Sequence, residues 1–230
     1  MRISMPALRI CKSNRRNPID EFFIVTALLA QTLKSKGVPL ESDPYLIYDE
    51  FKEADPGRQR DFLDKCRFYI RASEKAIEQE IELLHDKQFI WNTVKDMGLV
   101  LPSDVFELIT DHDEVEIYDS RGIQVFANFE FFRKVSYTPE EMYWKSWAEL
   151  FERDQKHFDQ LMQNFVYSIT EATGPFKPSI DKHLAWEIGS RRMKKNLVEF
   201  KMFAPIRSKL TNEKYMIASS RMDLVSEQPV

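Results

Sequence analysis

The stretch EVEIYDSRGIQVFANFEFFRKVSYTPEEMYWKSWAELFERD, from Glu114 to Asp154, decides the fold, because two short strands are followed there by several brief helices. Residues 115–118 and 123–126 have the apolar pattern of strands, and Asp119-Ser-Arg-Gly122 between them has the composition of a turn. Asp accepts backbone N–H bonds at the start of such a turn, and Gly supplies a positive φ at its end. The segment therefore predicts a β-hairpin.

Three helix starts follow the hairpin closely. Asn128 is a suitable N-cap for a helix over residues 129–133. Thr138-Pro-Glu-Glu141 and Ser146-Trp-Ala-Glu149 each have the spacing of a capping box, in which the N-cap hydroxyl and the later glutamate satisfy each other's backbone donors. Because the two boxes lie so close together, we expect helices of only one or two turns.

The remainder of the C-terminal half completes a sheet. A longer helix from Asp154 to about Glu171 has apolar residues at helical spacing. The pattern then becomes strand-like, and we expect strands over about 182–190, 196–207 and 214–224. The predicted fold class is α+β, with an N-terminal α-helical module followed by a five-stranded antiparallel sheet covered by short helices that leave room for a cavity.

The N-terminal hundred residues have a different character. Residues 1–17 are basic and without period, which is typical of a flexible tail. Helices are expected from Pro18 to about Lys36 and from Pro44 to Ala54. Residues 57–97 contain no proline and no internal glycine, and their apolar residues recur every seven positions, which predicts one long helix. We therefore expect a helical module over 18–98 and a second domain over 111–224.

Two interpretations of the long helix stay open. Its apolar stripe could pack on the N-terminal helices in a bundle, or it could pair with its copy in a homodimer, and both could hold. Charged residues occupy the outward positions in either case. The row predicted as the dimer interface consists of Leu63, Ile70, Ile77, Leu84 and Trp91.

Composition excludes several classes of partner. The formal net charge of -4 gives no general attraction to nucleic acid or to anionic membranes. The two cysteines, Cys11 and Cys66, have no metal-site spacing, and both are expected to be reduced. The longest apolar run, residues 22–30, is too short to span a bilayer and lacks the features of a signal peptide. We expect a cytoplasmic protein with no membrane span and no metal.

The C-terminal half resembles the PAS family of sensor domains over roughly residues 111–224. The resemblance rests on Tyr118-Asp-Ser-Arg-Gly122, Phe126-Ala-Asn128, Ser136-Tyr-Thr-Pro-Glu-Glu141 and Trp147, in that order and spacing. Ser136 stands where the family usually has glycine. The resemblance implies a domain that senses a ligand or cofactor, or that mediates dimerisation, and the fold alone does not choose between them.

The resemblance does not by itself identify a cofactor. Flavin photosensors of this family need a reactive cysteine, and residues 98–230 contain none, which argues against cysteinyl–flavin photochemistry. Haem-binding members use a histidine on the long helix. His157 has polar neighbours typical of a solvated turn, while His183 on a strand and His112 between two aspartates are poor candidates, so the sequence also argues against haem.

Aromatic and methionine side chains are the remaining evidence for a ligand. Most of them should fill the core, and those that line a pocket should suit a small, flat or lipid-like apolar molecule. The predicted ligand-binding residues are Phe126, Phe132, Met142, Trp147, Phe151, Phe158, Met162, Phe165, Trp186, Phe200 and Met202.

These observations predict a cytosolic regulatory protein rather than an enzyme. No catalytic signature or Gly-rich phosphate loop is present in the sequence. We expect a homodimer that relays ligand binding through the N-terminal helices to a downstream signalling protein. Two alternatives stay open: a phosphotransfer protein that uses His85, and a PAS scaffold that binds no ligand.

Overall fold

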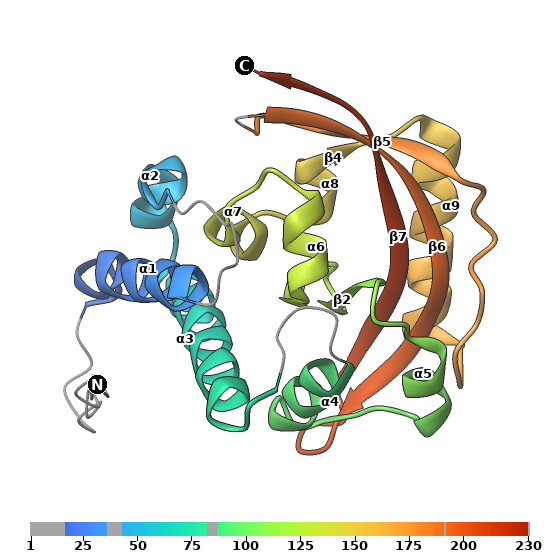
Figure 1. Ribbon diagram of the computed structural model, residues 1–230, viewed down its shortest axis with the longest axis horizontal. Helices are drawn as coiled ribbons and strands as arrows, with labels where there is room; N and C mark the ends of the chain where they lie inside the picture. Colours follow the sequence, from blue (N-terminus) through green and yellow to red (C-terminus); the bar gives the residue numbers. More distant parts are fainter. Residues whose placement is uncertain (1–16, 36–42, 82–86, 191, 230) are drawn as a thin grey trace.

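The computed structural model describes residues 17–35, 43–81, 87–190 and 192–229, and the chain is an α+β protein (Figure 1). The helices are α1 (Pro18–Ser35), α2 (Tyr45–Glu53), α3 (Pro56–Glu78), α4 (Lys87–Asp96), α5 (Ser103–Leu108), α6 (Phe129–Lys134), α7 (Pro139–Trp144), α8 (Trp147–Leu150) and α9 (Gln155–Thr170). The strands are β1 (Leu99–Val100), β2 (Glu114–Asp119), β3 (Gln124–Ala127), β4 (Phe151–Glu152), β5 (His183–Glu187), β6 (Arg192–Ser208) and β7 (Lys214–Pro229).

The strands form one antiparallel sheet in the order β3-β2-β7-β6-β5-β4, with β1 paired to the far end of β6. The five strands expected from the sequence are confirmed as β2, β3, β5, β6 and β7. The two-residue strands β1 and β4 add to them, so the sheet has seven strands. Strands this short carry no periodic pattern, and the sequence therefore could not indicate them.

The hairpin of β6 and β7 is the spine of the sheet. It pairs continuously from Arg192 opposite Pro229 to Arg207 opposite Lys214, with irregularities after Lys195 and after Phe200. β2 pairs with β7 only as far as Glu114 opposite Ser220, so the two long strands continue beyond it as a ribbon (Figure 1).

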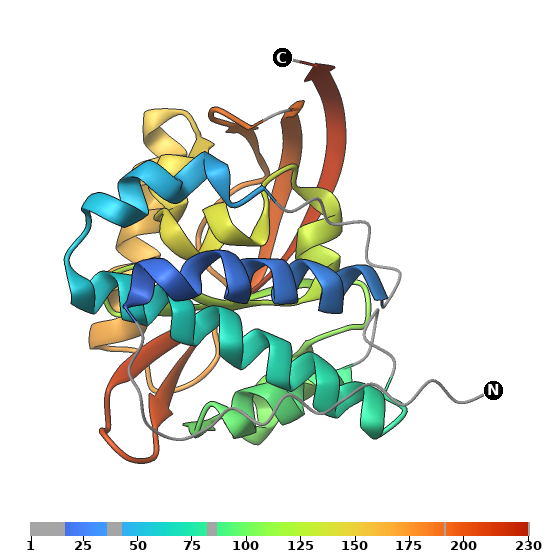
Figure 2. The ribbon, with the colours of Figure 1, turned by 90° about the vertical axis from the view of Figure 1, so that its left-hand side faces the viewer.

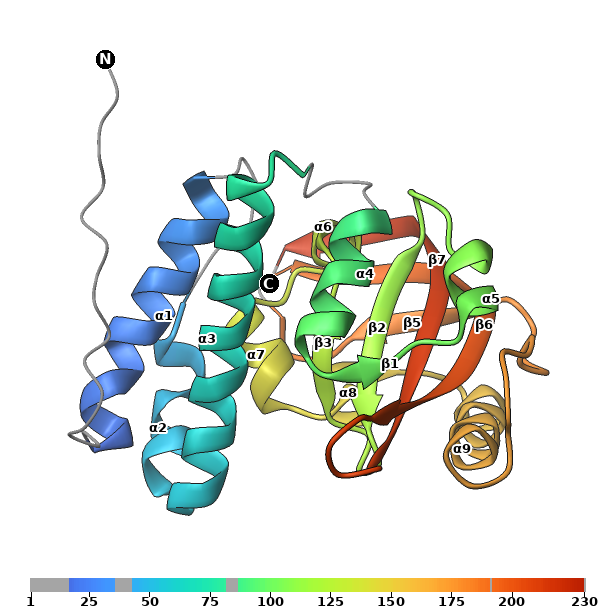
Figure 3. The same ribbon diagram turned by 90° about the horizontal axis from the view of Figure 1, so that it is seen from below.

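The N-terminal helices form a layer beside this sheet. α1 and α3 run side by side in Figure 2, where this layer faces the viewer. Asp55 begins α3 by accepting hydrogen bonds from the backbone N–H groups of Gly57 (2.8 Å) and Arg58 (3.1 Å). In the view from below, α4 and α5 lie at the top, over the strands, and α9 lies at the lower right (Figure 3).

The prediction of one long helix over 57–97 is wrong, because α3 ends at Glu78 and α4 begins only at Lys87. Glu80 has a φ of +55°. The Glu80 N–H donates to the Ile77 carbonyl (3.0 Å) and the Ile81 N–H to the Ala76 carbonyl (2.8 Å), which is a Schellman motif. This motif usually has glycine where Glu80 stands, so the sequence contained no recognisable stop.

Helices and sheet share one continuous hydrophobic core. Tyr69 of α3 is 1% exposed, and its hydroxyl donates a 2.8 Å hydrogen bond to the Ala127 carbonyl at the end of β3. The division into domains at 18–98 and 111–224 therefore stays a prediction, and the expected tail at 1–17 falls almost entirely outside the described residues.

The row predicted as a dimer interface is largely occupied within a single chain. Leu63 is 0% exposed and Ile70 is 4% exposed, so both belong to the chain's own core, as the bundle interpretation expects. Trp91 is half-buried and packs on Phe106, with ring centroids 5.1 Å apart, and Ile77 is also half-buried. Leu84 lies outside the described residues. The homodimer itself stays a prediction.

Candidate functional site

The turn between β2 and β3 forms as the sequence predicts. The Asp119 carboxylate accepts hydrogen bonds from the backbone N–H groups of Arg121 (2.9 Å) and Ile123 (3.0 Å), and Gly122 has a φ of +77°. The turn brings β3 back along β2 and places Gly122 against the side chain of Trp147.

Asn128 fixes the helix that follows. Its side-chain oxygen accepts hydrogen bonds from the backbone N–H groups of Phe131 (3.1 Å) and Val115 (3.0 Å), while its amide group donates to the Asp113 carbonyl (2.8 Å). One side chain therefore caps α6 and ties it to β2. As a result, Phe131 is held over the sheet.

Both predicted capping boxes are present. Thr138 and Glu141 begin α7, and Ser146 and Glu149 begin α8, where the Ser146 N–H donates to the Glu149 carboxylate at 2.7 Å. Two helix starts so close together let the chain turn sharply. α8 thereby directs Trp147 toward the sheet, and Phe151 and Arg153 follow it.

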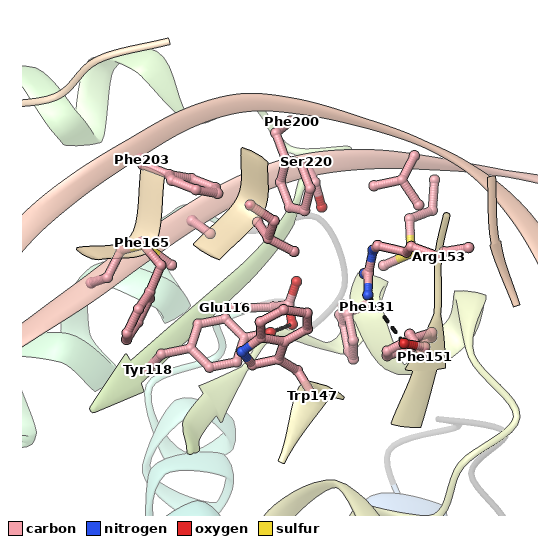
Figure 4. A pocket seen from close by; sticks show the side chains of 16 residues that line it. Glu116, Tyr118, Phe131, Trp147, Phe151, Arg153, Phe165, Phe200, Phe203 and Ser220 are labelled. Atoms are coloured by element: carbon pink, nitrogen blue, oxygen red, sulfur yellow. Dashed lines mark hydrogen bonds between the residues drawn. The ribbon is translucent and has the colours of Figure 1, made fainter. Parts of the chain in front are cut away.

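A pocket lies between the sheet, the short helices and α9 (Figure 4). It has a free volume of about 30 Å³, enough for about two water molecules as it stands. Its lining is mainly apolar. The lining residues are Glu116, Tyr118, Phe131, Trp147, Phe151, Arg153, Leu161, Phe165, Ala185, Val198, Phe200, Phe203, Met216, Ala218, Ser220 and Met222.

Arg153 is the cation of this pocket. Its guanidinium lies 5.3 Å from the ring centre of Trp147 and 5.4 Å from that of Phe151. Its Nε donates to His183 Nε2 at 3.2 Å, and its Nη1 makes a long contact of 3.5 Å with the Phe151 carbonyl. Burial lowers the pKa of Arg153 to about 10, against the opposing influence of Tyr118 and Glu116, so the side chain is still charged at pH 7.

Glu116 is the acid of the pocket. Its Oε2 accepts a hydrogen bond from Gln124 Nε2 (2.8 Å) and another from the Tyr118 hydroxyl. Burial raises the pKa of Glu116 to about 7, against the lowering influence of Tyr118, Arg153 and Gln124. In Figure 4 the side chains of Glu116 and Arg153 point toward one another across the pocket. The carboxyl group is therefore about half protonated near neutral pH.

His183 connects Arg153 to the helix α9. Its Nε2 accepts from Arg153, and its Nδ1 lies 3.0 Å from the Asp181 carbonyl, an arrangement that requires a neutral ring with the proton on Nδ1. Burial lowers the pKa of His183 to about 4. His157 stacks on it at 4.7 Å and contacts Asp154 at 2.5 Å through Nδ1.

Four of the eleven predicted ligand-binding residues line the pocket: Trp147, Phe151, Phe165 and Phe200. Phe126 does not line the pocket. It lies opposite Ile117 of β2, and Ile117 stands between the two pocket residues Glu116 and Tyr118. Alternate residues of a strand face opposite sides of a sheet. Phe126 therefore lies against Tyr69 and Phe89, with ring centroids 6.0 and 6.1 Å away.

The other predicted residues lie outside the pocket because their side chains point away from it or pack elsewhere. Trp186 and Met202 are strand neighbours of the lining residues Ala185 and Phe203 and face away from the pocket. Phe158 packs on the ring of Trp147 (5.6 Å between centroids). Met142 is buried in α7, and Met162 is half-buried beside Leu161 in α9.

On α6 the pocket is lined by Phe131, whereas Phe132 was predicted to line it. Phe132 instead contacts Tyr69 and Tyr143, with ring centroids 5.9 and 6.3 Å away. Successive residues of a helix point about 100° apart, so only one of the two can face the sheet. The sequence shows adjacent phenylalanines without indicating which one does.

Sequence reasoning missed the polar members of the site, Glu116, Tyr118, Arg153 and Ser220. One signal was available: Glu116 and Tyr118 alternate on a strand, and so do Met216, Ala218, Ser220 and Met222. Assigning those alternate residues to the helix-covered face would have identified most of the sheet's contribution to the pocket.

Of the histidines considered for other chemistry, His157 and His183 stack on one another, with ring centroids 4.7 Å apart. His85 lies outside the described residues. Within the described ranges, no three or more His, Cys, Asp or Glu side chains form a group that could hold a metal ion. In the same part of the chain, no helix has the length and apolar character needed to cross a bilayer.

No protein-family model matches the chain, and no curated protein matches it in sequence. Among solved structures, the chain is similar to the PAS-B domain of Drosophila melanogaster Cycle with bound ethylene glycol, at 12% identity and a TM-score of 0.37, over 48% of this chain and 98% of that one. It is also similar to a sensory box sensor histidine kinase from Vibrio cholerae, at 16% identity and a TM-score of 0.33, over 54% of this chain and 90% of that one. Scores this low decide neither fold nor function, so the α+β architecture rests on the elements described above.

Proposed function

We propose that the chain is a regulatory sensor whose pocket binds a small, mainly apolar molecule. The observation that carries the proposal is the pocket itself, an apolar space between the sheet and the short helices with few polar side chains in its wall. Ligand sites commonly combine an apolar lining with a few placed polar groups. The small free volume implies that a larger ligand displaces side chains, and half-buried Trp147 is the wall residue best placed to move.

The short helices that form one wall of the pocket also contact the N-terminal helices. Phe131 of α6 lines the pocket while Phe132 touches Tyr69 of α3. Similarly, Trp147 lines the pocket, and Trp144, three residues earlier, docks on the N-terminal layer. A shift of this wall on ligand binding would therefore reach the N-terminal helices through packed side chains.

Trp144 joins α7 to both α2 and α3 through polar contacts. Its indole Nε1 donates to Glu50 of α2 at 2.8 Å, and the Arg58 guanidinium of α3 lies 4.1 Å from its ring centre. Arg58 also donates to the Trp144 carbonyl at 3.1 Å. These contacts support the helices as the output of the sensor. A homodimer and a downstream partner remain parts of the proposal.

Binding is proposed rather than catalysis because the pocket lacks an activated nucleophile. The buried Ser220 hydroxyl has no hydrogen-bond partner among the described residues, and a serine nucleophile needs an adjacent base. His183 uses both ring nitrogens, for Arg153 and for the Asp181 carbonyl.

The proposal is tested by NMR of methionine methyl groups during titration with 1-hexanol. Met216 and Met222 line the pocket, whereas Met142 and Met202 are buried elsewhere. We expect saturable shifts of the first pair only. Ala218→Phe, which fills the pocket, should abolish them, and Ala148→Phe at an exposed position should not. Absence of saturable shifts in the wild type, or equal shifts in Ala218→Phe, would contradict a binding pocket at this place.

The relay is tested separately by amide hydrogen exchange. Saturating ligand should change the exchange rates of α3 in the wild type, and Trp144→Leu should reduce that change while leaving the methyl shifts of Met216 and Met222 in place. An unchanged α3 response in Trp144→Leu would exclude this route.

A further inference from the structure

We infer that the ligand of this pocket is a small monocarboxylic acid, whose carboxylate pairs with Arg153 and whose apolar tail lies among the aromatic side chains. The inference rests on the proposed function, because it names the chemical class of that same ligand. It follows from the N–H groups of Arg153 that have no partner among the described residues, and from the mainly apolar side chains around them.

Arg153 makes no ion pair with any carboxylate of the described residues. Its Nε is used by the neutral ring of His183, and its Nη1 has only the long contact with a backbone carbonyl. Its Nη2 donates to no group of the described residues, and none of their carboxylates lies within ion-pair distance of the guanidinium. The side chain is half-buried and its guanidinium packs beside two aromatic rings, so its unused N–H groups are placed to donate to an incoming anion.

No acid of the described pocket lining makes an ion pair with Arg153. Glu116 is the nearest acid in the lining, but its Oε2 is occupied by Gln124 and by the Tyr118 hydroxyl. Burial also holds the pKa of Glu116 at about 7, so below neutral pH most of this carboxyl is uncharged. When Glu116 carries its proton, Arg153 is the one charged side chain of the described lining, which matches a monoanion. A phosphate dianion would leave the occupied pocket with a net negative charge.

The remaining lining suits a short apolar tail. Phe131, Phe165 and Phe200 contribute aromatic surface, and Leu161 and Val198 contribute aliphatic surface. The free volume of about 30 Å³ holds about two water molecules before any side chain moves, so the tail must be short and enters only when a wall residue such as Trp147 moves aside. Arg also offers the planar pair of N–H donors that a carboxylate accepts, which an alcohol or amide cannot replace.

The test compares hexanoate with 1-hexanol and hexanamide at pH 6.5, with the same methionine methyl titration. Hexanoate should bind at least about tenfold more tightly than either neutral compound, since hydrogen bonds to a charged partner are roughly twice as strong as neutral ones. Arg153→Gln should remove this preference while hexanol still binds. Arg207→Gln, the same change at an exposed position, is the matched control. Arg153→Lys keeps the charge and should retain part of the preference, which guards against a folding defect in the Gln variant.

The outcomes separate this inference from the proposed function. Tighter binding of hexanoate that depends on Arg153 supports both. Equal binding of hexanoate and hexanol, or a preference that survives in Arg153→Gln, overturns the carboxylate and leaves the apolar pocket. No saturable shift of Met216 or Met222 with any of the three compounds overturns the pocket and the inference together.

Discussion

Gly122 shows how a single residue shapes both the turn and the pocket. Its φ of +77° is a conformation that residues with a side chain rarely adopt, and a Cβ built on it would lie 3.4 Å from Trp147 Nε1. The same position therefore contributes to hairpin stability and to the placement of a pocket wall.

Gly122→Ala should destabilise the protein by about 1 to 2 kcal/mol because the new side chain would be held in the left-handed conformation; its Cβ would meet Trp147 only at ordinary van der Waals distance. The matched control is Gly174→Ala, because Gly174 has no positive φ and an added Cβ there would meet no atom within 4 Å. That variant should be neutral or slightly stabilising. Urea unfolding of both variants measures the difference, and equal free energies would contradict the strain argument.

Glu114 makes stability depend on pH. Its Oε2 accepts a hydrogen bond from the Met222 N–H (3.0 Å), its Oε1 has no partner among the described residues, and the residue is 1% exposed. Burial raises the pKa of Glu114 from 4.5 to about 8. The folded state therefore holds the proton more strongly than the unfolded state. Its contribution to stability is complete below pH 4.5 and is lost as the pH rises toward 8.

Glu114→Gln removes this titration and should flatten the decline in stability between pH 5 and 8. Relative to the wild type, the variant should gain about 1 to 3 kcal/mol on going from pH 5 to pH 8.5. Urea unfolding at a series of pH values measures the gain. Glu152→Gln, at an exposed position, is the control and should follow the wild-type curve. Parallel curves for wild type and Glu114→Gln would show that this carboxyl does not titrate in the range.

At the scale of elements, the end of α3 is the informative case. Glu80 adopts the left-handed conformation that glycine adopts readily, so Glu80→Gly should stabilise the protein by about 0.5 to 1 kcal/mol. The same substitution at Glu74, in the exposed middle of α3, should destabilise it by about 1 kcal/mol. Thermal unfolding should therefore show a higher midpoint temperature for Glu80→Gly and a lower one for Glu74→Gly than for the wild type. A loss of stability in both would indicate that the helix continues through residue 80.

The elements with local signals could be predicted from the sequence. Asn128, Thr138 and Ser146 mark their helix starts through side-chain chemistry that acts over three residues, and the structure has a helix at each. The end of α3 was missed because Glu80 replaces the usual glycine. The short pairings of β1 and β4 were missed because they depend on β6 and β5, which are distant in sequence.

The pocket was harder to predict than the elements around it. Which of Phe131 and Phe132 faces the sheet depends on how α6 docks, and the facing of Phe126 depends on the register of β2 and β3. In the sequence, Arg153 stands among polar residues and has no feature that marks it as part of a pocket. Its role follows only from the three-dimensional placement of His183 and Trp147 around it.

At the scale of the whole molecule, the shared core predicts that the C-terminal half is not independent. Phe126 and Phe129 are 0% exposed and pack on Phe89, with ring centroids 6.1 and 5.3 Å away. A fragment of residues 111–229 would expose these rings, at roughly 1.5 to 3 kcal/mol for each.

We therefore expect fragment 111–229 to lack a cooperative thermal transition and to bind a dye for exposed apolar surface, whereas residues 17–229 should unfold cooperatively. Calorimetry and dye fluorescence of the two fragments measure this. Cooperative unfolding of the shorter fragment at the temperature of the longer one would support two separate domains instead.

Because α6 has one face in the pocket and the other on the helical layer, its sequence should evolve under two constraints at once. Phe131 and Phe132 are consecutive, yet one lies in the pocket and the other among the rings of the helical layer. We expect a substitution at Phe131 to shift α6 and, through Phe132, to favour a compensating change at Tyr69 or Tyr143. Homologues that have diverged in ligand should therefore show paired substitutions across this wall, and lineages that retain the ligand should hold both sides constant.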